Sequence, residues 1–469
     1  MRLVMKFGGT SVGDGQRIKD AAGLVFSSAA QGHAVVVTIS AMSGVTDALI
    51  RAARRAAEGD DQTYRAAQRT LAGQYRVALE YAVGDSAART ELRDQITRAL
   101  DGFADFCRSI HILGELTPRA LDAVASLGER MTAPIFAQAL RERGAQSEAI
   151  EATELIVTDD RFTQASPLMD ATREKTRARL LPLLDAGAIP VVTGFIGATR
   201  DGVTTTLGRG GSDYSATILG NALDADEVWI WTDVNGVMTA DPRVVPDAQS
   251  IAEISYAEAA ELSYFGAKVI HPQTISPVAE RDIPIRILNT FNPAHPGTRI
   301  VRAPRANGGT VKAITAIRHL SMINVEGRGM QGVPGVAAKV FSTVAREGIN
   351  VLMISQSSSE QSICFVVEAS AAARACAALE KEFELEKLRH NIDRVWAQAN
   401  VVIVAVVGAG MRGIPGIAAK VFGALGERGL NVISIAQGSS EYNLSLVMDE
   451  QDADDAVRAI HAGFNLHGA

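Results

Sequence analysis

From Met330 to Val367 the chain reads MQGVPGVAAKVFSTVAREGINVLMISQSSSEQSICFVV, and from Met411 to Met448 it reads MRGIPGIAAKVFGALGERGLNVISIAQGSSEYNLSLVM. The two stretches lie 81 residues apart and are identical at 18 of 38 aligned positions. A repeat this close predicts two copies of one structural module. Each copy reads as a strand, a glycine-rich turn, a helix and two further strands, and this order favours a βαββαβ unit.

The first copy contains every element of such a unit. We expect its elements at Met322–Glu326, Val336–Glu347, Asn350–Ser355, Ser362–Glu368, Ala371–Phe383 and Ile392–Ala397. The second copy ends after its second helix, near Asp452–Ala462, without a closing strand. A strand-like run at Val311–Ile317 precedes the first copy, and we expect it to fill the missing place. The first module would then be inserted within the second, so that neither folds alone.

Residues 1–300 alternate short β-branched runs with helical stretches. The predicted strands are Leu3–Phe7, Ala34–Ser40, Ile189–Thr193, Glu227–Trp231 and Ile285–Asn289. Strands separated by helices predict a three-layer α/β sheet that is mainly parallel. Residues 48–143 carry Ala, Arg, Glu and Leu at helical spacing and predict a helical excursion that forms a lid or one side of a cleft. Because residues 290–310 are rich in Pro, Gly and Asn, the predicted divisions are 1–300, 311–397 and 398–469.

Composition limits the class of protein. The net charge of −7 argues against a nucleic-acid partner, because proteins that bind nucleic acids are usually basic. Three cysteines form no even framework and no metal-ligand cluster, which favours a reducing cytoplasm. The N-terminal apolar run is broken by Lys6 and does not read as a signal peptide. The longest apolar run, at 401–408, is too short to span a bilayer.

The first candidate site is the segment Lys6-Phe7-Gly8-Gly9-Thr10-Ser11. A strand delivers Lys6, and the two glycines allow the backbone to come close to a ligand. Exposed N–H groups that lead into a helix bind phosphate, and a lysine adds a positive charge. The alternative is an ordinary tight turn with a surface lysine.

The second candidate site lies at residues 205–215, which read TTLGRGGSDYS. Three glycines in four residues do not fit the interior of a helix or strand. Arg209 offers two parallel N–H groups to a carboxylate or phosphate. Asp213 stands near the start of a helix, so the alternative is a capped loop in which Asp213 is the N-cap and Arg209 is solvated.

Two further segments and one misleading motif remain. Residues 231–237 end a predicted strand, where ligands gather in α/β sheets. Residues 265–272 place Lys268 beside a glycine, and we expect the nearby His271 to be structural. Both repeats fit G-x-G-x-x-G, but their next strands end at Gln356 and Gln437 rather than at the acid that a dinucleotide site needs. A loop that binds a small ligand is the better interpretation.

Together these residues resemble the aspartate kinase family. The resemblance rests on Lys6–Ser11, Ser40–Thr46, Gly128–Arg130, Thr206–Asp213, Trp231–Asp233 and Phe265–Lys268. The repeats resemble the paired ACT regulatory modules of that family, and the match covers essentially the whole chain in order. It implies a three-layer amino-acid-kinase sheet domain followed by two ACT-type βαββαβ modules. The sequence stops after the second module, so a monofunctional enzyme without a homoserine dehydrogenase domain is expected.

The resemblance implies transfer of the γ-phosphoryl group of MgATP to the β-carboxylate of L-aspartate. The product, 4-phospho-L-aspartate, feeds lysine, methionine and threonine synthesis. A carboxylate is already ionised at neutral pH, so the reaction needs no general base. It needs positioning and neutralisation of charge, because two anions must meet.

Roles for single residues follow from the resemblance alone. Lys6 would contact the transferring phosphate, and Asp213 would orient Lys6 or organise the phosphate end. The aspartate site would comprise Arg209 at the α-carboxylate, Glu129 at the amino group, and Ser40, Thr46, Gly210 and Ser212. The nucleotide site would comprise Lys6, Phe7, Gly8, Gly9, Thr232, Asp233, Met238, Arg243, Lys268 and Val269. Met238 stands where some relatives carry tyrosine, and no side chain is assigned as a metal ligand; Mg²⁺ is expected with ATP.

The repeats predict an effector site. Gln356 and Gln437 occupy equivalent places, and an amide that donates and accepts suits an amino acid; Asn350 and Asn431 are the next candidates. The alternative is that all four residues simply cap strands and turns. The stretches 356–360 and 437–441 resemble threonine-responsive relatives more than lysine-responsive ones, so feedback by threonine is favoured.

Partners and competing functions complete the expectation. We expect a cytoplasmic homodimer or larger oligomer formed through the repeats, with no nucleic-acid or membrane partner. The competing functions are a related kinase of the same fold acting on another substrate, such as glutamate, carbamate or a nucleotide, and an inactive amino-acid sensor. The segment Gly128–Arg130 and the paired repeats argue against the first, and Lys6, Glu129, Arg209 and Asp213 together argue against the second.

Overall fold

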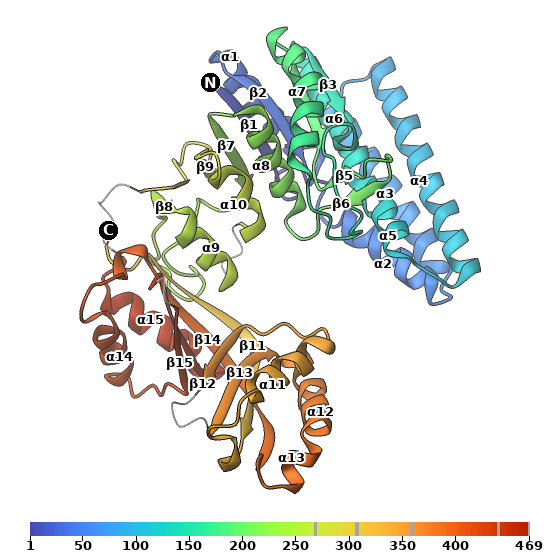
Figure 1. The fold of residues 1–469 in the computed structure, drawn as a ribbon. Coiled ribbons are helices and arrows are strands. Elements are labelled where there is room, and N and C mark those ends of the chain that lie inside the picture. Colours follow the sequence, from blue (N-terminus) through green and yellow to red (C-terminus); the bar gives the residue numbers. More distant parts are fainter. Residues whose placement is uncertain (267–269, 305–308, 357–360, 439–440, 468–469) are drawn as a thin grey trace. The chain divides into compact units, whose positions relative to one another are not determined.

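The computed structural model describes residues 1–266, 270–304, 309–356, 361–438 and 441–467 (Figure 1). The chain forms two compact units. The first unit contains Met1–Val237, Ala252–Tyr256 and Val269–Pro304, and the second contains Met238–Ile251, Ala257–Lys268 and Arg305–Ala469.

An eight-stranded sheet organises the first unit. Its order is β3-β4-β2-β1-β7-β9-β10-β8, and all neighbours are parallel except β9 and β10. The strands are β1 (Arg2–Phe7), β2 (Ala34–Ile39), β3 (Ser147–Ile150), β4 (Ile189–Thr193), β7 (Glu227–Thr232), β8 (Glu253–Ser255), β9 (Ile285–Asn289) and β10 (Thr298–Val301). A separate antiparallel pair is formed by β5 (Ile196–Ala198) and β6 (Thr204–Thr206). The five predicted strands are confirmed to within a residue.

Helices fill the intervals between these strands. They are α1 (Gly15–Ala30), α2 (Val45–Ala57), α3 (Gln62–Ala82), α4 (Ala87–Leu113), α5 (Pro118–Ala125), α6 (Leu127–Glu142), α7 (Met169–Asp185), α8 (Gly211–Leu223) and α10 (Pro272–Ala279). The predicted helical excursion over 48–143 is confirmed, because α2 to α6 occupy it. Side chains alternate across a strand, and Leu3, Met5 and Phe7 of β1 join the core formed with α1 and α6. Lys6 therefore points to the opposite face of the sheet.

The second unit contains one sheet shared by both repeats. Its order is β12-β13-β11-β14-β16-β15, and all its neighbours are antiparallel. The strands are β11 (Ala313–Glu326), β12 (Met353–Gln356), β13 (Ser362–Glu368), β14 (Arg394–Val407), β15 (Ser434–Gln437) and β16 (Asn443–Asp449). The helices are α9 (Tyr256–Tyr264), which begins at the last residue of a first-unit segment, and α11 (Val336–Arg346), α12 (Ala372–Glu382), α13 (Glu384–Leu388), α14 (Ile417–Gly426) and α15 (Ala453–Gly463).

The two longest strands join the repeats. Residues predicted as separate strands at 311–317 and 322–326 form one 14-residue strand, β11, with a register shift after Ile317. Its first half, Ala313–Ile317, pairs with Ile403–Val407 in the second repeat, as the missing closing strand was predicted to do. Its second half pairs with β13 of the first repeat. The first module is thus inserted within the second.

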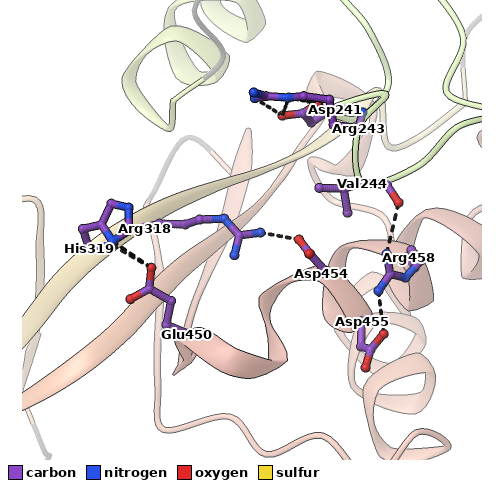
Figure 2. Close-up of polar contacts among 9 residues, drawn as sticks. All are labelled: Asp241, Arg243, Val244, Arg318, His319, Glu450, Asp454, Asp455 and Arg458. Carbon is purple, nitrogen blue, oxygen red and sulfur yellow. Dashed lines mark hydrogen bonds and ion pairs between the residues drawn. The ribbon is translucent and has the colours of Figure 1, made fainter.

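A segment before the repeats packs into the same unit. Ala240, Val245 and Ala248 share a buried core with Val404 and Ile460 of the second repeat. The Thr239 hydroxyl lies 3.0 Å from His461 Nε2, and the Arg458 guanidinium donates to the Val244 carbonyl at 3.2 Å. Figure 2 shows this region, together with the ion pair that joins Arg318 of β11 to Asp454 of α15. The interval 1–300 therefore contains stretches that fold with the repeats.

No helix in the described part of the chain has both the length and the apolar character needed to cross a membrane.

Candidate functional site

A cavity of about 300 Å³ lies in the first unit at the carboxyl ends of β1 and β2. Its lining includes eight predicted site residues: Lys6, Ser40, Thr46, Glu129, Arg209, Gly210, Ser212 and Asp213. Four more residues complete it, and sequence reasoning had not assigned them roles there: Ala41, Phe195, Gly208 and Gly211. Segments that are distant in the sequence thus form one cavity.

Lys6 and Asp213 form an ion pair in this cavity. Lys6 is only 8% exposed, and its Nζ atom lies 2.5 Å from Asp213 Oδ1. The interpretation of Lys6 as a surface lysine is therefore wrong, because β1 turns its side chain inward toward α8. Asp213 is not the N-cap either, since Gly210 holds that position and Asp213 lies in the first turn of α8.

Glu129 is the most buried acid of the cavity. It lies in the first turn of α6 and is 3% exposed, and its Oε2 atom has no hydrogen-bond partner among the described residues. Burial raises the pKa of Glu129 to about 8, although backbone N–H groups and the charge of Lys6 act in the opposite direction. A buried carboxyl with one free oxygen suits a cationic group of a ligand.

The position of Glu129 depends on the glycine before it. A Cβ atom at Gly128 would lie 2.5 Å from the Ala41 Cβ atom, so only glycine allows α6 to approach the residues after β2. The buried Tyr75 hydroxyl donates to the Gly128 carbonyl at 3.0 Å and lies 3.1 Å from the Thr132 hydroxyl. This contact helps to fix the start of α6.

Arg209 lies on the turn that leads into α8. Gly210 has φ +71°, and a Cβ atom there would lie 2.8 Å from the His271 Cβ atom, so the turn requires glycine. Arg209 itself is exposed, with its side chain at the cavity. The Gly211 N–H donates to the Gly208 carbonyl at 3.0 Å, whereas the start of α8 as a whole and the Arg209 guanidinium together suit an anion. His271 caps α10 through Nδ1, which accepts from the Gln273 N–H, and the structural role expected for it is confirmed.

The predicted nucleotide residues are only partly brought together. Gly8 N–H donates to the Trp231 carbonyl at 3.2 Å, which places the glycine turn against the end of β7, next to Thr232. The Phe7 ring is buried in the core and stacks on Trp231, so only its backbone faces the turn. Asp233 follows β7, and its Oδ1 atom accepts from the Thr232 hydroxyl at 3.2 Å.

The other predicted nucleotide residues belong to the second unit or lie outside the described residues. Met238 and Arg243 belong to the second unit, where the exposed Arg243 pairs with Asp241 at 2.6 Å. Lys268 and Val269 lie outside the described residues.

The four predicted effector residues are exposed in the second unit. Gln356 ends β12 and Gln437 ends β15, as expected. Asn350 and Asn431 were expected to open these strands, but the strands begin three residues later, at Met353 and Ser434. The residues after Gln356, up to Glu360, lie outside the described part.

One N–H group of the second glycine-rich turn has a carboxylate partner within the chain. The Gly413 N–H donates to the Glu441 carboxylate at 2.7 Å.

Comparison with known proteins agrees with this geometry. Residues 1–289 match the amino acid kinase family, and residues 323–383 and 404–464 match an ACT domain family. The chain is 38% identical over 470 residues to the chloroplastic bifunctional aspartokinase/homoserine dehydrogenase 1 of Zea mays, covering 99% of this chain and 50% of that protein. It is 34% identical to the chloroplastic aspartokinase 3 of Arabidopsis thaliana, covering 99% of this chain and 82% of that one. The chain thus spans about half the length of the bifunctional relatives it matches.

Solved structures give the same picture. The R-state structure of E. coli aspartokinase III with aspartate and ADP superposes with a TM-score of 0.83 at 32% identity, covering 99% of this chain and all of that one. The T-state structure of the same enzyme, with lysine and aspartate, gives a TM-score of 0.79 at 32% identity and covers 98% and 99% of the two chains.

Proposed function

The chain belongs to the amino acid kinase family, as an aspartokinase with two ACT domains, and from this premise we propose that it phosphorylates the β-carboxylate of L-aspartate with MgATP. The observation that carries the proposal is the cavity that combines the Lys6–Asp213 pair, the buried Glu129 and the Arg209 turn. Its lining offers one charged group each for the α-carboxylate and the ammonium group of the amino acid, and one cation for the phosphate.

The substrate roles follow from charge and burial. The Arg209 guanidinium pairs with the α-carboxylate through two N–H groups, which fixes both position and orientation. Glu129 accepts from the ammonium group, because a buried carboxyl with a free oxygen gains most from a cation. Thr46 and Ser212 offer hydroxyl groups to the side chain. The β-carboxylate is then held toward Lys6 as an ionised nucleophile, and no residue has to remove a proton from it.

Lys6 and Asp213 serve the phosphate end. Lys6 Nζ neutralises charge on the transferring phosphoryl group, and the Asp213 carboxylate holds that ammonium in place. Mg²⁺ binds through phosphates and one or two carboxylates, and Asp213 is the carboxylate of the cavity that fits this role. When bound, the ion would lower the repulsion between the two anions.

Trapping the product tests the proposal. The whole chain incubated with L-aspartate, MgATP and hydroxylamine should yield aspartyl hydroxamate, because an acyl phosphate reacts with this nucleophile. Parallel reactions with L-glutamate and without ATP are the controls. Hydroxamate from glutamate alone would instead indicate the related kinase, and none from any substrate would indicate the sensor.

We further propose that threonine is the effector and binds at the glycine-rich turns beside Gln356 and Gln437. The support is the Gly413 N–H, which already binds a carboxylate, and the side-chain amides that end β12 and β15. Threonine should inhibit, lysine should inhibit less, and Gln356→Ala combined with Gln437→Ala should relieve the inhibition with turnover nearly unchanged. Threonine inhibition that persists in the double variant, or inhibition by lysine alone, would contradict the assignment of threonine to this site.

We also propose that the second unit forms a homodimer or larger oligomer. Four apolar side chains at equivalent places in the repeats are about half exposed: Val333, Ile354, Ile414 and Ile435. Ile354 and Ile435 lie on β12 and β15, the last strands of the sheet, where exposed apolar groups favour association with a second copy. Sedimentation should give at least a dimer at working concentration, and Ile354→Lys with Ile435→Lys should weaken it; a monomeric unmodified chain would contradict the proposal.

A further inference from the structure

The carboxylate of Asp122 is buried behind the cavity. Asp122 lies on α5 and is 1% exposed. It accepts from the Thr206 hydroxyl at 2.6 Å and from the Thr206 N–H at 3.0 Å. It also accepts from the Thr163 N–H, at 2.9 and 3.1 Å to its two oxygens. A buried carboxylate with this many donors is a strong local anchor.

Both of its partners adjoin the substrate turn. Thr206 ends β6 three residues before Arg209, and its carbonyl accepts from the Ala165 N–H at 2.9 Å. The Thr163 carbonyl lies close to the turn at Gly208, because a Cβ atom at Gly208 would lie 3.2 Å from that oxygen. Asp122 therefore holds both the strand that delivers Arg209 and the segment packed against the turn.

Thr163 carries backbone strain at this contact. Its φ is +72°, a left-handed conformation that is unfavourable for a β-branched side chain. Such a conformation persists only where the surroundings enforce it, and it is found preferentially near functional sites. The Asp122 carboxylate, which holds the Thr163 N–H with both oxygens, supplies this restraint.

A second contact ties the same strand to the neighbouring helix. The Arg130 guanidinium donates to the Thr204 hydroxyl at 3.2 Å and pairs with Glu151 at 3.0 Å. Arg130 follows Glu129 directly in α6. The α5–α6 region therefore carries the acid for the ammonium group and also anchors the strand that leads to Arg209.

We propose that Asp122 is a positioning residue for the aspartate substrate. It holds the turn at Gly208–Gly210 so that Arg209 meets the α-carboxylate while Glu129 meets the ammonium group. This rests on the proposed function. Asp122 does not line the cavity, and it acts on the substrate through Arg209.

Kinetics of Asp122→Asn test this role. Asparagine keeps the shape but replaces one acceptor with a donor that faces N–H groups. The KM for aspartate should rise roughly 10- to 100-fold, because small displacements of a positioning group have effects of that order, whereas the KM for ATP should stay within about twofold. Equal changes in both KM values would overturn the proposal.

A double-mutant cycle separates positioning from general damage. In an Arg209→Ala background, Asp122→Asn should add little further increase in the aspartate KM, since its effect passes through Arg209. If the two substitutions raised the aspartate KM independently, so that their effects multiplied, the proposal would be overturned. Ser147→Ala is the matched control, because it removes a buried hydroxyl that donates to the Ile189 carbonyl away from the cavity. It should lower thermal stability without changing the ratio of the two KM values.

A milder variant covers the case in which Asp122→Asn does not fold. Thr206→Val removes only the 2.6 Å hydroxyl contact and should raise the aspartate KM in the same direction by a smaller factor. An unchanged aspartate KM in Thr206→Val would count against the role of Asp122. These outcomes are distinct from failure of the proposed function, which would appear as no hydroxamate from the unmodified chain.

Discussion

The buried ammonium group of Lys6 carries its charge close to two acids. Its ammonium contacts Asp213, and its charge also reaches Glu129. Removing one member of a buried charged group is costly, because the remaining charge then lacks a partner. Because the Lys6 side chain is buried, its loss should lower stability as well as turnover.

Lys6→Met should lower turnover on the order of 10²–10³-fold, the usual effect of losing one preorganised charge contact. It should also lower the melting temperature, because Asp213 loses its partner. The double variant Lys6→Met/Asp213→Asn should regain thermal stability but not turnover. Near-normal kcat in the folded single variant would remove Lys6 from the phosphate site.

Arg209→Lys should fail nearly as badly as Arg209→Ala. A guanidinium makes two parallel bonds to a carboxylate, whereas an ammonium cannot reproduce that geometry. The defect should appear in the KM for aspartate, and ATP binding measured by calorimetry should be nearly unchanged. A matching loss of ATP affinity would instead assign Arg209 to the nucleotide end.

Glu129 should make aspartate binding depend on pH. Its pKa of about 8 means that it is mostly protonated at pH 7, and an incoming ammonium group favours the ionised form. Aspartate affinity should therefore rise from pH 6 to pH 8 and then level off. Calorimetry in two buffers of different ionisation enthalpy should show release of nearly one proton at pH 7, and Glu129→Gln should abolish the release.

The same carboxyl affects stability with a definite sign. Its pKa in the folded protein lies above the ordinary value of 4.5. The stability that this raised pKa contributes is therefore fully present below pH 4.5 and is lost as the pH rises through about 8. Glu129→Gln should hence keep or raise the melting temperature at pH 8 while aspartate affinity falls. A fall in both the melting temperature and the aspartate affinity would contradict the conclusion that burial disfavours the ionised Glu129.

At the scale of elements, the sequence predicted what has a strong local pattern. Strand β2, which reads AVVVTI, is a nearly continuous β-branched run and was found within a residue. Strands β5, β6 and β8 have three residues each, too few to show a period, and they were missed. β6 matters most among these, because it leads to the Arg209 turn.

The site was predictable to a similar degree. Glycine-rich segments with a cation indicated Lys6 and Arg209, because such turns can present backbone N–H groups and a positive charge to an anion. Asp122 gave no signal, since one aspartate on a short amphipathic helix looks like many surface residues. The positive φ of Phe195 at the cavity also leaves no mark in a sequence.

The contact between α15 and the segment 238–251 predicts acid sensitivity. His461 is 2% exposed, and burial, with a smaller effect of His467, lowers its pKa despite the opposing charge of Asp247. A lowered histidine pKa means that stability falls as the pH drops below the ordinary value of 6.5.

Thermal melting of the second unit should therefore shift downward between pH 7 and pH 5. His461→Gln can keep a contact with the Thr239 hydroxyl but cannot titrate, so its melting temperature should change less over this range. An identical pH dependence in both proteins would show that other groups cause it.

At the scale of the whole molecule, a boundary at residue 305 does not separate the two units, because residues before it fold with the second unit. The buried residues Ala240, Val245 and Ala248 belong to the core of the second unit. A fragment ending at residue 304 should expose them and lose thermal stability and solubility, in addition to effector response and association. Gel filtration and melting of that fragment test this. A stable fragment with full activity would show that the segment folds without the repeats.

The interleaved order of the chain also bears on folding during synthesis. Thr239 and its partner His461 are 222 residues apart. At about 5–20 residues per second, the earlier residue leaves the ribosome roughly 10 to 45 s before the later one. Throughout that interval the nascent chain carries apolar residues whose covering helix has not yet been made. We therefore expect the yield of folded protein to depend on chaperones and on the speed of the ribosome.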